Sequence, residues 1–120
     1  VTVEKARAVH ELTLPADAVV LLEDLGNLVG NELFSPEAGA RSEETVLCAL
    51  NESLLVLEKK CGQLIPVGAL LAEEPRYGDP DTERYMRIFS ALQNALAARA
   101  DAVYLAELGA VRCLKRKEGP

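Results

Sequence analysis

The sequence predicts one α/β domain with a mostly parallel sheet. Two continuous apolar runs, residues 18–22 and 64–71, have the length and composition of buried strands. Residues 42–60 and 83–99 repeat apolar side chains at helical spacing. Strands that alternate with helices are typical of parallel sheets joined by right-handed crossovers. We therefore expect the two apolar runs to lie side by side between layers of helices.

The composition is that of a globular protein, and it restricts the possible partners. The chain has 120 residues, 49% hydrophobic and 27% charged, so we expect a single domain over 1–120 with one core. With 13 basic and 19 acidic residues, the net charge of −6 disfavours nonspecific binding to nucleic acid or to an anionic membrane. No apolar run approaches the roughly 20 residues that span a bilayer. Three scattered cysteines without a C-x-x-C pair argue against zinc and favour reduced thiols in the cytoplasm.

The first 22 residues are expected to contain two strands and a short helix. Residues 1–4 alternate and are rich in β-branched side chains, which favours a short strand. Residues 4–12 fit a short helix that ends before Pro15. Residues 18–22 do not alternate, so we expect a strand that is covered on both faces.

Two helices are expected next. In residues 25–34 the apolar side chains fall on one helical face, although Gly26 and Gly30 each weaken a helix by about 1 kcal/mol. Ser42 is a suitable N-cap for the second helix because acids follow it in the first turn. That helix is expected to extend to about Lys60, before a glycine.

The next segment repeats the order of strand and helix. Residues 64–71 form the second buried strand, and Pro66 is expected at its start because proline donates no ladder hydrogen bond. A loop with two prolines and a glycine follows. Asp81 or Thr82 is expected to cap a helix over about 83–99.

The chain is expected to end in a hairpin. Residues 102–106 form a third strand, Leu108–Gly109 a tight turn, and residues 110–114 an antiparallel return strand. Residues 115–117 are all basic and are expected to form a solvated tail.

Acidic residues follow the predicted strands. Glu23–Asp24, Glu73–Glu74 and Glu107 each come directly or shortly after an apolar run. Ligands of open α/β sheets bind beyond the carboxyl ends of the strands, where an acid can order Mg²⁺. Glu23 is the best candidate because it follows the run that we expect to be most buried. The alternative is that these acids only solvate the strand ends, which is the more common role of an isolated acid.

The sequence contains no phosphate-binding loop. Neither G-x-x-x-x-G-K-[ST] nor G-x-G-x-x-G occurs, so the chain by itself lacks the backbone amides and the lysine that hold nucleotide phosphates. For the other potentially reactive side chains we expect structural roles and not catalytic ones. His10 is expected on the surface, Cys48 as a buried thiol, and Tyr85 with Phe89 as a packed pair on one helix face.

Two segments carry a resemblance to a known family. A strand that ends in Leu22–Glu23 leads into a helical segment with Asn31 and a Leu-Phe ending. Residues 96–105 lead from a helix into the third predicted strand, and Gly109 provides the next turn. These features resemble the family of adenosylcobinamide kinase/adenosylcobinamide-phosphate guanylyltransferase. The resemblance covers nearly the whole chain and corresponds to the C-terminal two-thirds of a family enzyme.

The resemblance implies a three-layer P-loop NTPase fold, truncated at its N-terminus, and a step in cobalamin biosynthesis. Family members phosphorylate adenosylcobinamide with a nucleoside triphosphate and then transfer GMP from GTP through a guanylylated histidine. The resemblance also implies Mg²⁺ with GTP or ATP, a cytoplasmic location and a homo-oligomer such as a trimer. By position, Glu23 would help to order Mg²⁺, and Asn31 would orient the adjacent helix or the ligand.

The sequence departs from the family pattern at several positions. The P-loop and the guanylylated histidine would lie before Val1, and His10 does not match that histidine. In the family's Asn-Glu-Val-Gly turn only the Glu has a match, at Glu74. The family's Arg-Asp pair falls on Met86 and Arg87, which makes Arg87 a candidate binding residue. We therefore expect this chain alone to be inactive and to bind no nucleotide tightly.

The sequence leaves other functions open. One is a non-catalytic α/β assembly or regulatory module that binds no nucleotide, and another is a generic α/β domain whose similarity is accidental. A P-loop sheet places its P-loop strand centrally. Without that strand, residues 18–22 and 64–71 would expose unpaired edges or apolar faces, so we expect the chain to self-associate.

Overall fold

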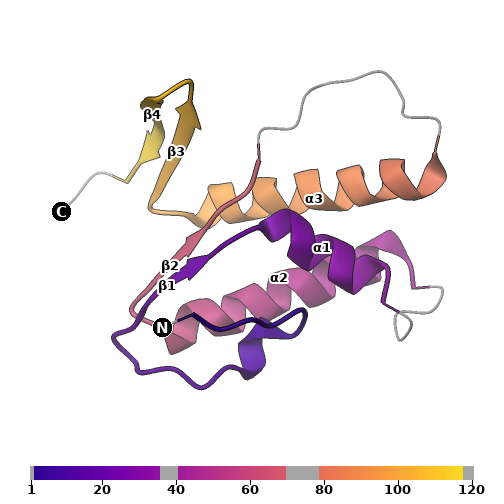
Figure 1. Ribbon diagram of the computed structural model, residues 1–120, viewed down its shortest axis with the longest axis horizontal. Helices are drawn as coiled ribbons and strands as arrows, with labels where there is room; N and C mark the ends of the chain where they lie inside the picture. Colours follow the sequence, from indigo (N-terminus) through magenta and orange to yellow (C-terminus); the bar gives the residue numbers. More distant parts are fainter. Residues whose placement is uncertain (1, 36–40, 70–78, 118–120) are drawn as a thin grey trace.

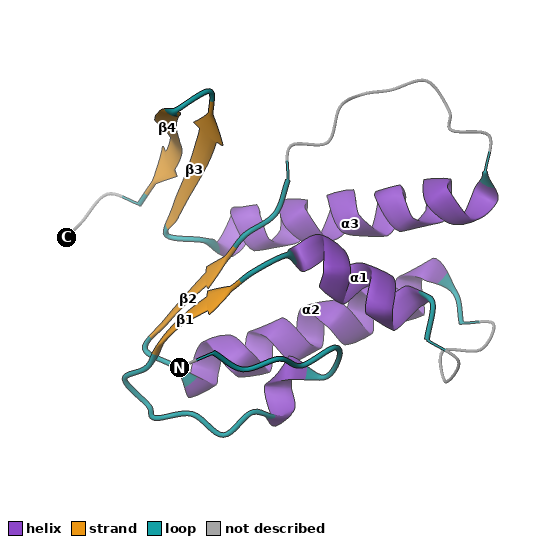
Figure 2. Ribbon diagram, in the orientation of Figure 1, coloured by secondary structure: helices purple, strands orange, loops and turns teal. Residues whose placement is uncertain are grey.

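The computed structural model describes residues 2–35, 41–69 and 79–117. In these residues three α-helices lie together, and two separate two-stranded sheets adjoin them (Figures 1 and 2). The elements in chain order are the 3₁₀ turn η1 (Val9–Glu11), β1 (Val19–Leu22), α1 (Leu25–Leu33), α2 (Glu43–Lys60), β2 (Gln63–Pro66), α3 (Pro80–Arg99), β3 (Ala102–Glu107) and β4 (Ala110–Arg116). The α/β class is confirmed, with one parallel pair and one antiparallel hairpin.

The three helices build the hydrophobic core. α1, α2 and α3 pack against one another, and their inward faces supply all but one of its buried side chains. The core consists of Val9, Leu25, Leu28, Val29, Leu33, Val46, Leu50, Leu54, Leu57, Ile88, Phe89, Leu92 and Leu96. Apolar residues three or four positions apart share one side of a helix, so each helix buries one stripe. The helical stripes predicted for residues 42–60 and 83–99 are confirmed.

Side-chain caps set the beginnings of the two long helices. Ser42 Oγ accepts a hydrogen bond from the backbone N–H three residues on, at 3.1 Å, as predicted. α3 begins earlier than predicted, because Asp79 caps it in place of Asp81 or Thr82. The Asp79 side chain accepts from the Asp81 N–H at 3.1 Å. Pro80 occupies the first helical position, where its fixed φ suits a helix and its missing N–H costs nothing.

β1 and β2 form a parallel pair with one exposed apolar face. Their residues pair in register from Val19 with Gln63 to Leu22 with Pro66. On one face, Leu22 and Leu64 pack against the helical core. The other face, called the open face below, carries four exposed apolar side chains: Val19 (64%), Leu21 (56%), Ile65 (40%) and Val67 (44%). The expectation that the first strand is covered on both faces is therefore wrong for the described residues, because their helices cover only one face.

Pro66 ends β2 and does not start it. In the parallel ladder the N–H groups of Gln63 and Val67 donate to the carbonyls of Ala18 and Leu22. Because N–H groups alternate in direction along a strand, the nitrogen of Pro66 faces the edge that β1 does not occupy. Proline is tolerated here since its missing donor costs no hydrogen bond to β1. The predicted strand over residues 64–71 is too long: β2 ends at Pro66, and residues 67–69 are not in a strand. Residues 70 and 71 lie outside the described residues.

β3 and β4 form an antiparallel hairpin that extends away from the helices (Figure 1). Leu108 and Gly109 form its turn, both with positive φ (50° and 78°), which matches the twist of the flanking strands. The Lys115 Nζ donates to the carbonyls of Ala97 and Ala98 near the end of α3, at 2.9 Å each. The hairpin is confirmed, but the prediction of a solvated tail is wrong for Lys115, because the carbonyls at a helix end attract a cation.

The N-terminal segment is less regular than predicted. Residues 2–5 form no strand, and within the segment predicted as helix only η1 is helical. Ala8 has a φ of 56°, a left-handed conformation that interrupts a right-handed helix. Val9 is buried in the core next to α2. The segment therefore forms neither a strand nor a longer helix, and it is held by the burial of Val9 and by contacts from neighbouring side chains.

Candidate functional site

The end of β1 carries Glu23 and lies beside the end of β2. Because the strands are parallel, their carboxyl ends meet at one edge. Two backbone hydrogen bonds join them: the Val67 N–H donates to the Leu22 carbonyl at 3.0 Å, and the Leu25 N–H donates to the Val67 carbonyl at 2.9 Å. Glu23 lies between these two bonds and is exposed. The structure therefore places Glu23 at the carboxyl end of a parallel strand, as the sequence predicts.

The β1–α1 turn, residues 23–26, has an unusual backbone conformation. Asp24 has φ 73° and ψ 83°, in the left-handed region that a non-glycine residue rarely occupies. Such a conformation costs on the order of 1–3 kcal/mol and persists only where the surroundings fix it. The Asp24 carboxylate accepts a hydrogen bond from the Asn27 N–H at 3.2 Å, which caps α1. The carboxylate of Asp24 is therefore committed to the helix, whereas that of Glu23 is not.

Tyr85 reaches this turn from α3. Its hydroxyl donates to the Gly26 carbonyl at 3.0 Å. Its ring lies near those of Phe34 and Phe89, with centroids 6.5 and 5.8 Å away. A Cβ atom on Gly26 would lie 2.8 Å from the Tyr85 hydroxyl, so any larger residue here would force the hydroxyl or the turn to shift. Partial burial, and secondly the charge of Asp24, raise the pKa of Tyr85.

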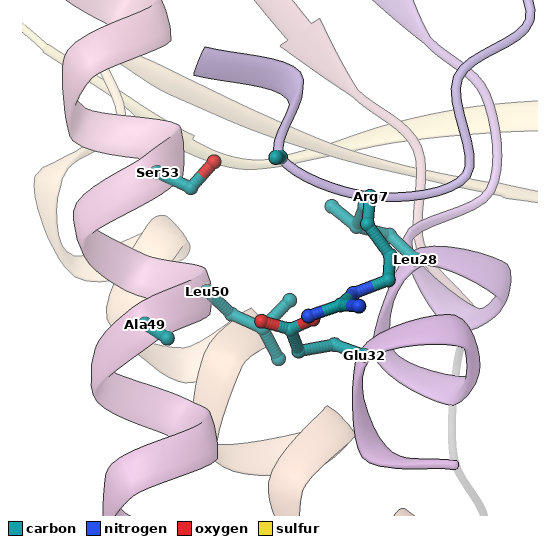
Figure 3. Close-up of a pocket in the computed structure, with 7 residues that line it drawn as sticks. Arg7, Leu28, Glu32, Ala49, Leu50 and Ser53 are labelled. Atoms are coloured by element: carbon teal, nitrogen blue, oxygen red, sulfur yellow. The ribbon is translucent and has the colours of Figure 1, made fainter. Parts of the chain in front are cut away.

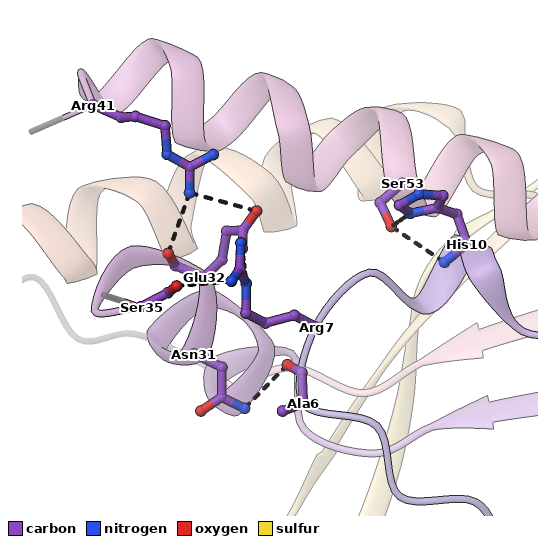
Figure 4. A network of polar contacts seen from close by, with 8 residues as sticks. All are labelled: Ala6, Arg7, His10, Asn31, Glu32, Ser35, Arg41 and Ser53. Carbon is purple, nitrogen blue, oxygen red and sulfur yellow. Dashed lines mark hydrogen bonds and ion pairs between the residues drawn. The ribbon is translucent and has the colours of Figure 1, made fainter. Parts of the chain in front are cut away.

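The other predicted site residues lie apart from Glu23. Asn31 Nδ2 donates to the carbonyl of Ala6 at 3.2 Å, so it ties the N-terminal segment to α1 (Figure 4). Arg87 pairs with Glu43, and no hydrogen bond or ion pair between described residues joins Glu23 to either of them. Glu74 lies outside the described residues, as do Glu73 and most of the loop after β2.

Arg87 and Glu43 form a surface ion pair between α3 and the first turn of α2. Arg87 Nε lies 3.2 Å from each carboxylate oxygen of Glu43. This hydrogen bonding is the main cause that lowers the pKa of Glu43 and raises that of Arg87. Arg87 therefore joins two helices through an exposed contact, which a bound anion would have to displace.

A small pocket lies on the other side of α1, between the N-terminal segment and α2 (Figure 3). Its lining includes Arg7, Glu32, Leu50 and Ser53, and its volume is about 20 Å³. A cavity of that size holds about one water molecule. The pocket is therefore too small for a nucleotide or a cobinamide.

Residues that are far apart in the sequence make polar contacts with one another around this pocket (Figure 4). Arg7 pairs with Glu32, which also lies 3.6 Å from Arg41 in a second ion pair. His10 Nδ1 lies 2.8 Å from Ser53 Oγ, so His10 is half-buried and hydrogen-bonded instead of being a free surface side chain. No local sequence pattern indicates these pairs, because their members are between 9 and 43 positions apart. They fasten the N-terminal segment to α1 and α2.

The cysteines give no indication of a site. All three are free, and Cys48 is exposed on α2, so its prediction as a buried thiol is wrong. It lies two positions beyond Val46 and two before Leu50, which puts it outside the buried stripe. In the part of the chain that the structure describes, no three His, Cys, Asp or Glu side chains are grouped so that they could hold a metal. Nor does a helix there combine the length and apolar character needed to cross a bilayer.

A scan against protein-family models finds no match, and a search of curated proteins finds none. The function proposed below rests on the geometry of the chain and on the residues that carry the family resemblance.

Proposed function

We propose that this chain is the C-terminal portion of a nucleotide-dependent transferase that acts on adenosylcobinamide in cobalamin biosynthesis. The observation that carries the proposal is the exposed Glu23 at the carboxyl end of a parallel strand pair. Among the described residues this pair has no further strand beside it and one uncovered apolar face. Open α/β sheets bind their ligands beyond the carboxyl ends of their strands, where Glu23 lies. On this proposal the 120 residues contribute one side of the site and are inactive alone.

Glu23 suits an indirect role toward Mg²⁺. Magnesium prefers oxygen ligands, keeps several of its waters and is held largely by nucleotide phosphates. Glu23 is the carboxylate of the β1–α1 turn that makes no hydrogen bond or ion pair with another described residue, whereas Asp24 caps α1. One free carboxylate fits a metal whose remaining ligands are water and phosphate. When bound, the ion would neutralise charge on the transferred phosphoryl group.

The remaining site residues are proposed by resemblance. Glu74 would be the second acid at the same edge, from the loop after β2. Asn31 would act by orienting α1, which its hydrogen bond to Ala6 supports. Arg87 would bind nucleotide or substrate after exchanging Glu43 for a phosphate, since a guanidinium binds either anion through paired donors.

The presence of two separate sheets supports the proposal that a central strand of the complete protein lies outside this chain. β1–β2 and β3–β4 share no ladder, so β2 and β3 each have one edge without a partner strand among the described residues. The arrows of β2 and β3 point in the same general direction in Figure 1. A parallel strand inserted between them would join both pairs into one sheet, and a helix after that strand would cover the open face. A strand, a phosphate-binding loop and a helix are the parts of the P-loop unit that this sequence lacks.

The proposal includes the cofactors, the location and the assembly. Mg²⁺ with GTP or ATP would bind the complete protein and only weakly this chain. The location would be cytoplasmic, where the three free thiols stay reduced. For the chain alone, the four exposed side chains of the open face favour self-association, because large apolar patches mark contact surfaces.

Two observations test this function. The reading frame upstream of Val1 should encode a G-x-x-x-x-G-K-[ST] loop, and an unrelated domain there would contradict the proposal. Thermal unfolding of the complete protein should then shift upward with GTP and Mg²⁺, since ligand at about 100 times Kd stabilises by about 2.7 kcal/mol. The variant E23Q should lose most of the shift that depends on Mg²⁺. E52Q removes an exposed acid on α2 and should retain the shift.

A second candidate is a non-catalytic module that binds no nucleotide, and Pro66 favours it. The nitrogen of Pro66 faces the free edge of β2, where a paired strand would find no donor at that position. Proline at an edge is one device that prevents strand addition. If this candidate is correct, neither GTP nor ATP with Mg²⁺ stabilises the complete protein.

A further inference from the structure

We propose that Tyr85 is a positioning residue whose hydroxyl holds the β1–α1 turn and thereby the carboxylate of Glu23. The inference rests on the proposed function of Glu23 and adds a residue to it. Tyr85 lies on α3, 59 positions from the carbonyl that it contacts. No described contact joins Tyr85 to Glu23 directly, so its effect is transmitted through the backbone of the turn.

Three consecutive residues where the turn enters α1, residues 25–27, are each held by a different partner. The Leu25 N–H donates to the Val67 carbonyl beyond β2 at 2.9 Å. The Gly26 carbonyl accepts from the Tyr85 hydroxyl at 3.0 Å. The Asn27 N–H donates to the Asp24 carboxylate at 3.2 Å. Together these bonds join the turn to β2, to α3 and to its own cap.

This set of bonds explains how Asp24 can keep its left-handed backbone. A non-glycine residue in that conformation is strained and relaxes unless its neighbours are fixed. The Glu23 carboxylate is attached next to Asp24, so a change of the Asp24 backbone would reorient Glu23. Of the three bonds, the one from Tyr85 is the only one that comes from a helix far along the chain.

The role belongs to the hydroxyl and can be separated from that of the ring. The ring packs between Phe34 and Phe89. Phenylalanine at position 85 would keep this packing and remove only the hydrogen bond. The glycine at position 26 leaves the space that the hydroxyl needs, because a Cβ there would lie within 3.2 Å of Tyr85, Asp24 and Phe89.

The test compares Y85F with Y104F in the chain and in the complete protein. Y104F removes a hydroxyl from the exposed hairpin, where it accepts from Arg116, far from the turn in the sequence. Amide hydrogen exchange of Asn27 in the chain should speed up about three- to tenfold in Y85F and stay unchanged in Y104F. Unchanged exchange in Y85F would overturn the role of the hydroxyl in holding the turn.

The second measurement separates positioning from folding. In the complete protein, Y85F should raise the Mg²⁺ concentration that gives half-maximal activity several-fold, in the same direction as E23Q, while Y104F does not. If exchange accelerates but the Mg²⁺ dependence stays as in the wild type, Tyr85 is merely structural and the proposal is wrong. If E23Q itself leaves the Mg²⁺ dependence unchanged, the proposed function fails, and the role of Tyr85 toward Glu23 fails with it.

Discussion

Leu21 and Leu22 are adjacent leucines on opposite faces of β1. Replacing each with alanine should therefore change the unfolding free energy by different amounts. Leu21 lies on the open face and is 56% exposed, whereas Leu22 packs against the helical core. Complete burial of a leucine side chain is worth about 1.5–3 kcal/mol, so Leu21→Ala should cost less than about 1 kcal/mol. Leu22→Ala also leaves a cavity and should cost about 2 kcal/mol, near the lower end for leucine in a core.

Urea unfolding at low protein concentration measures both losses. Light scattering at higher protein concentration measures self-association. Leu21→Ala should weaken the association more than Leu22→Ala does. Equal losses of stability in the two variants of the dilute protein would contradict the assignment of Leu21 and Leu22 to opposite faces. Equal losses would mean that another part of the same chain covers the open face.

The other predictions concern the helices and their contacts. Ser42→Ala should lower the unfolding free energy by about 1 kcal/mol through loss of the α2 cap, as measured by urea unfolding. The folded-state pKa of Glu43 lies below its ordinary value of 4.5, so the small stabilisation from its pair with Arg87 is present above that pH and is lost as the pH falls further. Arg87→Ala should raise the Glu43 pKa in an NMR titration, and an unchanged value would contradict the pairing. Gly26→Ala should destabilise the fold although alanine favours helices, because its Cβ would lie 2.8 Å from the Tyr85 hydroxyl. Adding Tyr85→Phe should then recover part of the loss, and no recovery would exclude this clash as the cause.

Elements whose cause is local were predictable from the sequence. The apolar stripe of α2 and its cap at Ser42 belong to one helix, and the hairpin strands adjoin their turn at Gly109. The position of Glu23 at a strand end was predictable for the same reason. In each case the pattern and its structural consequence span at most a few turns of helix or one hairpin.

Features whose cause is distant were missed. The sequence does not show that the helices cover only one face of β1, because the run of residues 18–22 is apolar on both faces. Pro66 lies at the end of β2 and not at its start as predicted. The sequence does not show on which edge of β2 the partner strand β1 lies, and this decides where a proline fits. The contacts of Tyr85 with Gly26 and of His10 with Ser53 span 59 and 43 positions, and no spacing rule indicates them.

On the proposed function, the carboxyl end of β1, where Glu23 lies, faces a metal-bound nucleotide. The most direct measurement is NMR line broadening by Mn²⁺, used in place of Mg²⁺ with GTP, in the complete protein. Amide signals of residues 23–26 should broaden first, and those near Glu52 and of the hairpin turn should not broaden. Broadening that spares residues 23–26, or that is unchanged when Glu23 is replaced by glutamine, would contradict the proposed function.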